Sequence, residues 1–154
     1  MKFFSFLVIT LLFSFSAAAQ TLPDFSFTNA KKEKITPAAL PQNKPIVVCY
    51  FDPFCEKCIT QAAAIKQHAA KLSGITIVYV SWAEFEDIEA FKKKYFTGMP
   101  NVFMCKDDSF KFDTWFGYSE LPVIYVYNKA RARTAAFTTV VAVEEILTAC
   151  KKTL

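Results

Sequence analysis

The sequence carries little net charge and, after its first residues, no long hydrophobic run. Lysine and arginine number 18 against 14 acidic residues, which leaves a formal charge of +4 at pH 7. The basic residues are scattered, apart from small clusters such as Lys31-Lys32 and Lys92–Lys94. So weak an excess gives no case for nucleic-acid binding. No repeat, low-complexity tract or linker divides the chain, so the sequence predicts one domain.

The first residues have the layout of a secretory signal peptide. Lys2 precedes an apolar stretch over residues 3–15, and the small residues Ala17–Ala19 come before Gln20. An uncleaved anchor is the alternative, but a membrane span needs roughly 20 apolar residues. No cysteine closely follows the stretch, so a lipid anchor is not indicated. We therefore expect cleavage after Ala19, a domain over residues 20–154, and a periplasmic or secreted protein.

The rest of the chain alternates between strand-like and helix-like segments. β-Branched and apolar runs predict strands over 46–51, 75–82, 123–127 and 131–138, the last two joined by a turn at Asn128-Lys129. Apolar residues at helical spacing predict helices over 59–72, 84–96 and 143–152. The order is that of an α/β fold with a parallel unit first and a hairpin last.

Two cysteines in the stretch "PFCEKC", residues 53–58, are the candidate reactive groups. We expect the helix to begin at Cys58, which places Cys55 at or just before its N-terminus. Unpaired backbone N–H groups there favour a thiolate over a thiol. Lys57 should favour the thiolate further, whereas Glu56 should oppose it. Cys55 is therefore the predicted nucleophile and Cys58 the more buried partner with which it can form a disulfide.

These features resemble thioredoxin-fold thiol-disulfide oxidoreductases, in particular the secreted, TlpA-like bacterial group. The likeness rests on the C-x-x-C pair together with "LPDFSF" at 22–27, Lys31–Ile35, "TPAALPQNKPIVVCYF" at 36–51 and "LPVIYVY" at 121–127. It implies a central mixed β-sheet flanked by helices, with an N-terminal hairpin extension.

The resemblance also implies roles for single residues. Cys55 and Cys58 would be catalytic without a cofactor. Pro122 would be a cis-proline facing them, with Leu121 and Phe54 also at the substrate. Protein disulfides or thiols would be the substrates of a monomer that depends on an upstream redox partner.

The chain departs from this pattern at several positions. Phe54 stands where thioredoxins usually carry tryptophan, which keeps an aromatic ring but loses the indole N–H. Cys49 stands where thioredoxins have a buried acid, which leaves Asp52, Glu56 or water as candidates for proton exchange with Cys58. The final helix lacks the glycine that usually precedes it.

The other cysteines and the single histidine have plainer interpretations. Cys49 lies among large apolar neighbours, which predicts a buried and inert core thiol. Cys105 and Cys150 could form a structural disulfide, because an exported protein permits one. His68, on the first predicted helix, is expected to face solvent or to be partly packed.

Three classes of function remain open. The first is thiol-disulfide exchange through Cys55 and Cys58, for which oxidant, reductant and isomerase roles are all open and the resemblance favours a reductant. The second is copper or zinc handling by the same pair with His68 or Cys105, although strong zinc patterns bring two paired motifs and this chain has one. The third is a binding module that keeps the fold without redox activity.

Overall fold

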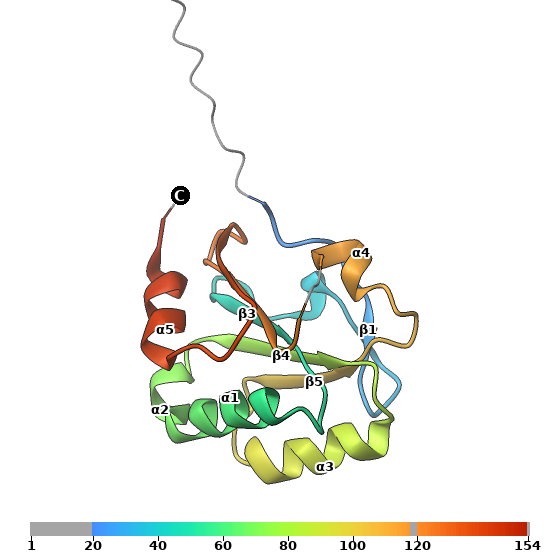
Figure 1. Cartoon of the computed structure of the whole chain (residues 1–154). Helices are drawn as coiled ribbons and strands as arrows, with labels where there is room; N and C mark the ends of the chain where they lie inside the picture. Colours follow the sequence, from blue (N-terminus) through green and yellow to red (C-terminus); the bar gives the residue numbers. More distant parts are fainter. Residues whose placement is uncertain (1–19, 118–119, 154) are drawn as a thin grey trace, which may run out of the picture.

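One mixed sheet of seven strands organises the part of the chain that the structure, a computed structural model, describes: residues 20–117 and 120–153. The strand order is β2-β1-β5-β4-β3-β6-β7 (Figure 1). The strands are β1 (Phe27–Thr28), β2 (Lys34–Ile35), β3 (Ile46–Tyr50), β4 (Thr76–Ser81), β5 (Val102–Lys106), β6 (Val123–Tyr127) and β7 (Arg133–Phe137). Strands β3, β4 and β5 run parallel, whereas β6 and β7 form an antiparallel pair. The predicted α/β order, with a parallel unit first and a hairpin last, is confirmed.

Strand β3 lies in the interior of the sheet, between β4 and β6, because its sequence can be buried on both faces. Its residues Ile46–Tyr50 are all buried. It pairs with β4 in parallel and with β6 in antiparallel orientation. A continuous apolar run of this kind fits a strand that helices cover on both sides. The end of β3 leads directly into the cysteine pair.

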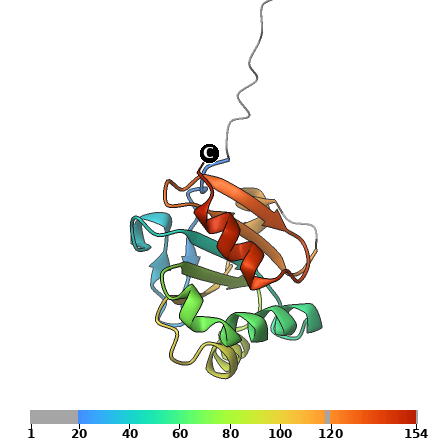
Figure 2. The same ribbon diagram turned by 90° about the vertical axis from the view of Figure 1, so that its left-hand side faces the viewer.

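Helices cover the sheet unequally. They are the 3₁₀ turn η1 (Pro37–Ala39) and the α-helices α1 (Glu56–Gln67), α2 (Ala69–Leu72), α3 (Phe85–Tyr95), α4 (Phe112–Phe116) and α5 (Val143–Lys151). Helices α1, α3 and α5 pack on one core cluster, and α4 packs on a second cluster with β1 and the preceding residues. Figures 1 and 2 show this division of the two faces.

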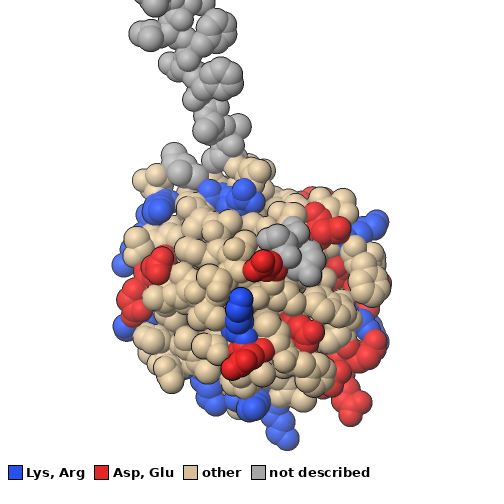
Figure 3. Space-filling view, in the orientation of Figure 1, with Lys and Arg blue, Asp and Glu red and all other residues tan. Residues whose placement is uncertain are grey.

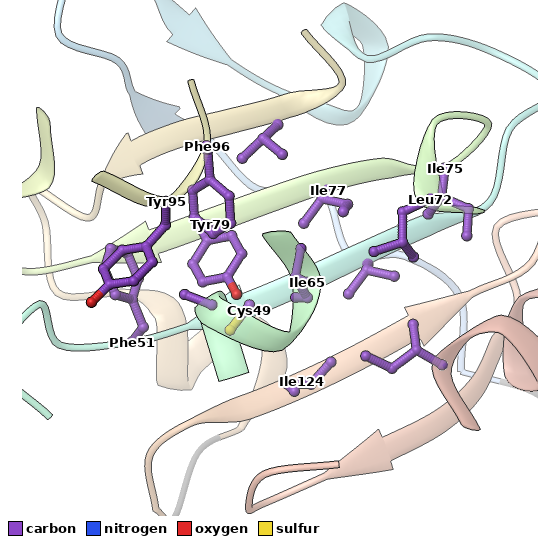
Figure 4. Packing of buried hydrophobic residues seen from close by; sticks show 14 of the residues in the cluster. Cys49, Phe51, Ile65, Leu72, Ile75, Ile77, Tyr79, Tyr95, Phe96 and Ile124 are labelled. Carbon is purple, nitrogen blue, oxygen red and sulfur yellow. The ribbon is translucent and has the colours of Figure 1, made fainter. Parts of the chain in front are cut away.

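The first core cluster lies between α1, α3, α5 and the sheet. Its sheet residues include Cys49, Ile77 and Tyr79, against which Ile65 of α1 packs (Figure 4). All four side chains are at most 1% exposed. The cluster therefore anchors the helix that begins at the cysteine pair, and this fixes the position of the candidate site.

Both boundaries of the first helix differ from the sequence-based expectation. The first helix begins at Glu56 rather than at Cys58, with Cys55 as its N-cap. It also stops at Gln67 rather than continuing to Leu72, because His68 has φ −107° and ψ 20° and separates α1 from α2. The His68 backbone N–H still donates to the carbonyls of Ala64 and Ile65, so the residue between the two helices stays hydrogen-bonded to the last turn of α1.

Strand β5 and helix α4 were not predicted. The residues Phe103 and Lys106 of β5 are only half-buried, so the segment lacks a continuous buried run. Helix α4 is five residues long and consists largely of aromatic residues that also suit strands or loops. Its buried Phe112 and Phe116 pack against the second face of the sheet.

The N-terminal hairpin extension is present as the antiparallel pair of β1 and β2. The predicted signal peptide, residues 1–19, lies outside the described residues, so its cleavage stays a prediction. No described helix has the length and apolar character that a membrane span requires.

Candidate active site

The cysteine pair lies where β3 turns into α1. After β3, the backbone N–H of Phe54 donates to the Asp52 carboxylate across 2.8 Å, and the N–H of Cys55 donates to the Asp52 carbonyl across 3.1 Å. Cys55 then caps the helix. The Asp52 turn thus places the first cysteine at the positive end of α1, as the sequence predicts, even though the helix begins two residues earlier than expected.

The two cysteines differ in exposure and contacts. Cys55 is half-buried, whereas Cys58 is 1% exposed. The backbone N–H of Cys58 donates a hydrogen bond to the Cys55 sulfur across 3.4 Å. Such a bond stabilises negative charge on Cys55. The geometry therefore gives the two sulfurs different roles, with Cys55 outside and Cys58 inside.

Burial raises the pKa of the Cys58 thiol above its ordinary value. Its hydrogen bond with Cys55 raises the pKa further, and the charges of Cys49 and Cys55 act in the same direction, while a backbone hydrogen bond from Asp52 opposes them. The cause is that a thiolate loses hydration inside the protein. Cys58 is therefore held as a neutral thiol.

Cys49 and Tyr79 lie behind the pair. Cys49 is 1% exposed, and burial raises its pKa to about 12, although the Tyr79 hydroxyl lowers it in part. Burial also raises the pKa of Tyr79, with the charge of Cys49 as the next cause. The predicted buried core thiol at Cys49 is confirmed.

Leu121 and Pro122 lie immediately before β6, which pairs with β3 on the side opposite β4. The residue that follows them, Val123, pairs with Tyr50 at the end of β3. Pro122 is buried, and the half-buried Leu121 packs against both core clusters. The Leu121–Pro122 peptide bond is cis. That these two residues contact substrate stays a prediction.

Three predicted site residues lie on the surface beside Cys55. Phe54 is 75% exposed, and Glu56 and Lys57 are exposed on the first turn of α1. Phe54 is free to contact a bound molecule. The influence of Glu56 and Lys57 on the Cys55 thiolate stays a prediction.

The remaining candidates lie away from the pair. Cys105 and Cys150 are both free thiols that belong to different core clusters, so the disulfide that the sequence left open between them is not formed in this structure. Burial raises their pKa values to about 12 and about 11. The half-buried His68 lies 3.5 Å from Glu144 at the far end of α1.

The alternative metal site needs His68 or Cys105 beside the cysteine pair, and neither is there. Across residues 20–117 and 120–153, no group of three or more His, Cys, Asp or Glu side chains is arranged to hold a metal ion. The ligand set considered for copper or zinc is therefore not assembled.

Two residues near the pair, Gln61 and Tyr79, were not predicted from the sequence. Gln61 lies one turn after Cys58 on the buried side of α1, and its side-chain oxygen accepts the backbone N–H of Val141 across 2.8 Å. Tyr79 faces Cys49. A polar side chain three residues after Cys58 was an available signal for Gln61, whereas only the pairing of β3 with β4 reveals Tyr79.

The fold is thioredoxin-like, as comparison with solved structures shows. A secreted disulfide oxidoreductase of Mycobacterium tuberculosis, homologous to Escherichia coli DsbE, is 20% identical with a TM-score of 0.67, covering 82% of this chain and 94% of its own. A thioredoxin-family thiol:disulfide interchange protein of Chlorobium tepidum is 17% identical with a TM-score of 0.70, covering 88% and 96%. DsbF of M. tuberculosis is 18% identical with a TM-score of 0.68, covering 86% and 96%.

The family follows from the sequence itself. Residues 18–139 match the model of the AhpC/TSA family, so the chain belongs to that family. The curated proteins contain no match to this chain. The thioredoxin-fold resemblance found in the sequence is confirmed, and so is its mixed, helix-flanked sheet.

Proposed function

We propose that this protein is an exported thiol-disulfide oxidoreductase that exchanges a Cys55–Cys58 dithiol with protein disulfides. One observation carries the proposal. The half-buried sulfur of Cys55 caps α1 within hydrogen-bond reach of the Cys58 N–H, and Cys58 lies buried behind it. An accessible thiol with a buried partner one turn away is the arrangement that two-step disulfide exchange requires.

The reaction proceeds in two exchanges. The Cys55 thiolate attacks one sulfur of the substrate disulfide, which forms a mixed disulfide and releases the first substrate thiolate. Cys58 then gives up its proton and attacks the Cys55 sulfur, which releases the second substrate thiol. Two electrons pass from the protein to the substrate, and a Cys55–Cys58 disulfide remains.

Burial of Cys58 suits this order of events. Because its pKa is raised by burial, Cys58 is protonated while Cys55 attacks. Only in the mixed disulfide, where Cys55 no longer carries negative charge, does the loss of the Cys58 proton become easier. Asp52, Glu56 and water remain the candidates for receiving that proton.

Variants of the two cysteines test the proposal. Cys58→Ser keeps the attacking sulfur but cannot resolve, so it should accumulate mixed disulfides with a disulfide-bonded test protein such as insulin. Cys55→Ser should form none and should lose reductase activity. Cys150→Ser is the control, since Cys150 lies outside the pair, and it should retain activity. Full activity in Cys55→Ser would overturn the proposal.

From the resemblance, we propose that the protein acts as a reductant of its substrates. An upstream redox partner would then be its electron donor. Equilibration with glutathione followed by mass spectrometry measures the reduction potential. A reductant should have a potential below about −200 mV, and a value near −120 mV would indicate an oxidant instead.

Export is proposed from the first 19 residues. Protein recovered from the periplasm or medium should begin at Gln20 in intact-mass analysis. Material that retains Met1 and stays with the membrane would contradict both the cleavage after Ala19 and the proposed location.

A further inference from the structure

Two large apolar side chains are strongly exposed in the described part of the chain, and both lie at one edge of the sheet. Phe54 is 75% exposed and Phe110 is 69% exposed. Phe54 follows β3, and Phe110 follows β5. Since β3, β4 and β5 are parallel neighbours, both rings emerge where these strands end. The half-buried Trp82 follows β4 and lies between them in the strand order.

Backbone hydrogen bonds hold these three strand ends together. Beyond the end of β3, the N–H of Phe51 donates to the Val80 carbonyl of β4 across 3.0 Å. Beyond the end of β5, the N–H of Asp107 donates to the Ser81 carbonyl across 2.9 Å. Neighbouring strands lie about 4.8 Å apart, so the ends of β3 and β5 are separated by about 10 Å. The segments that carry the two exposed rings therefore begin about 10 Å apart, a span that a few residues of an extended peptide can cover.

The loop that carries Phe110 is held in place by a buried carboxylate. Asp107 is 1% exposed, and its two oxygens accept the backbone N–H groups of Lys111 at 3.1 Å and Phe112 at 2.9 Å. The ring of Phe112 in turn stacks on Tyr50 with 4.0 Å between centroids. Phe110 itself has φ +52°, a conformation uncommon for a bulky residue. The loop is thus fixed while its ring faces solvent, and such preorganisation lowers the entropy cost of binding.

The same edge is acidic although the whole chain has a formal charge of +4. Glu84 is neutralised by Lys106 at 2.8 Å. The other acidic residues within seven residues of the ends of β3, β4 and β5 or of the start of β6, apart from the buried Asp107, are Asp52, Glu56, Glu86, Asp87, Asp108, Asp113 and Glu120. The same segments contain the exposed basic residues Lys57 and Lys111, so acidic residues remain in excess there. Figure 3 shows more acidic than basic side chains on the right-hand half of this face, toward the ends of β4 and β5, although basic side chains also appear at its right margin.

We propose that Phe54, Trp82 and Phe110, with their acidic surroundings, form a client-binding edge for an extended polypeptide segment that carries apolar and basic residues beside its cysteine. The inference rests on the proposed function, because the reaction at Cys55 brings such a segment to this edge. The exposed rings bury apolar side chains of the client, and the carboxylates attract its lysine or arginine residues. A small neutral disulfide presents neither a large apolar side chain nor a basic group to the edge, so the edge selects proteins over small molecules.

Single-turnover kinetics with three probes test the edge. The probes are two disulfide-linked peptides, one with phenylalanine and lysine beside its cysteine and one with glycine and glutamate there, and the small neutral hydroxyethyl disulfide. The reduced protein should react roughly tenfold faster with the first peptide than with the second, and 0.5 M salt should reduce that ratio. Phe110→Ala and Asp108→Lys should each lower the ratio several-fold and leave the rate with hydroxyethyl disulfide unchanged.

Matched controls separate binding from other effects. Ser109→Ala changes the same loop without removing a ring or a charge, and Glu145→Lys reverses an exposed charge on α5. Both should keep the peptide ratio of the unmodified protein. Equal rates for the two peptides, or a ratio that survives both Phe110→Ala and Asp108→Lys, would overturn the client-binding edge. If the unmodified protein does not react with hydroxyethyl disulfide at all, that result would instead contradict the proposed function.

Discussion

The hydroxyl group of Tyr79 lies against the sulfur of Cys49, its partner in the register of β4 and β3 (Figure 4). Both side chains are buried, and no polar atom of the described residues meets that hydroxyl with full hydrogen-bond geometry. A thiol is a weak partner for a hydroxyl. The buried hydroxyl of Tyr79, behind Cys58, therefore lowers the stability of the folded protein rather than raising it.

Tyr79→Phe should consequently be tolerated. The ring that packs on Phe51 and Phe96 remains, and only the poorly satisfied hydroxyl is lost. We expect the free energy of unfolding to change by less than about 1 kcal/mol in either direction. Urea titration measures it. A loss above about 2 kcal/mol would mean that the hydroxyl makes a strong hydrogen bond.

Gln61→Leu should be clearly destabilising. The side-chain oxygen of Gln61 accepts the N–H of Val141, and leucine would leave that buried N–H without a partner. Leucine would also remove the buried Nε2 group of Gln61, which has no partner among the described residues and offsets part of this loss. A buried unsatisfied donor costs about 1 to 3 kcal/mol. Gln67→Leu is the matched control, because Gln67 is exposed on the same helix and should change stability little. Equal urea midpoints for the two variants would show that the bond to Val141 does not outweigh the cost of the unpaired Nε2 group of Gln61.

Alkylation should distinguish Cys55 from the other four cysteines. Cys55 is half-buried, while the others are buried, and burial raises the pKa of each of those thiols. With iodoacetamide at neutral pH, peptide mass spectrometry of the reduced protein should show Cys55 labelled at least about tenfold faster than the rest. Comparable labelling of Cys58 would contradict the division of roles within the pair.

Stability should fall at alkaline pH through the buried thiols. Burial raises the pKa of Cys105 from 9.0 to about 12, so above pH 9 the unfolded chain loses this proton and the folded protein keeps it. The contribution of Cys105 is therefore present below pH 9 and is lost as pH rises toward 12. The slope is about 1.4 kcal/mol per pH unit.

Cys105→Ala isolates this contribution. The advantage of the unmodified protein over the variant in urea titrations should shrink by roughly 2 kcal/mol between pH 8 and pH 10.5. The packing loss from the substitution is present at both pH values and cancels in that comparison. A constant difference between the two proteins across this range would mean that Cys105 titrates as it does in the unfolded chain.

Local patterns in the sequence were sufficient for the elements around the cysteine pair. The apolar run of β3, the helical spacing that follows it and the β6–β7 hairpin were placed within a few residues, because each has a clear period or turn signal. The location of Cys55 at a helix start and the burial of Cys58 followed from that placement. The helix start itself was two residues off, because Cys55 caps the helix with its sulfur and no periodicity marks that position.

The tertiary structure decided what depends on residues distant in the chain. Strand β5 lies between β1 and β4, and α4 covers the face opposite α1, although neither has a pattern that distinguishes it locally. The proposed edge with Phe54 and Phe110 depends on the parallel pairing of β3 and β5 with β4, because this pairing brings all three strands to the same end of the sheet. Cys49 faces Tyr79, and Cys105 and Cys150 lie apart, for the same reason: strand order and sheet face determine which side chains meet, and neither is encoded in the spacing of residues along one segment.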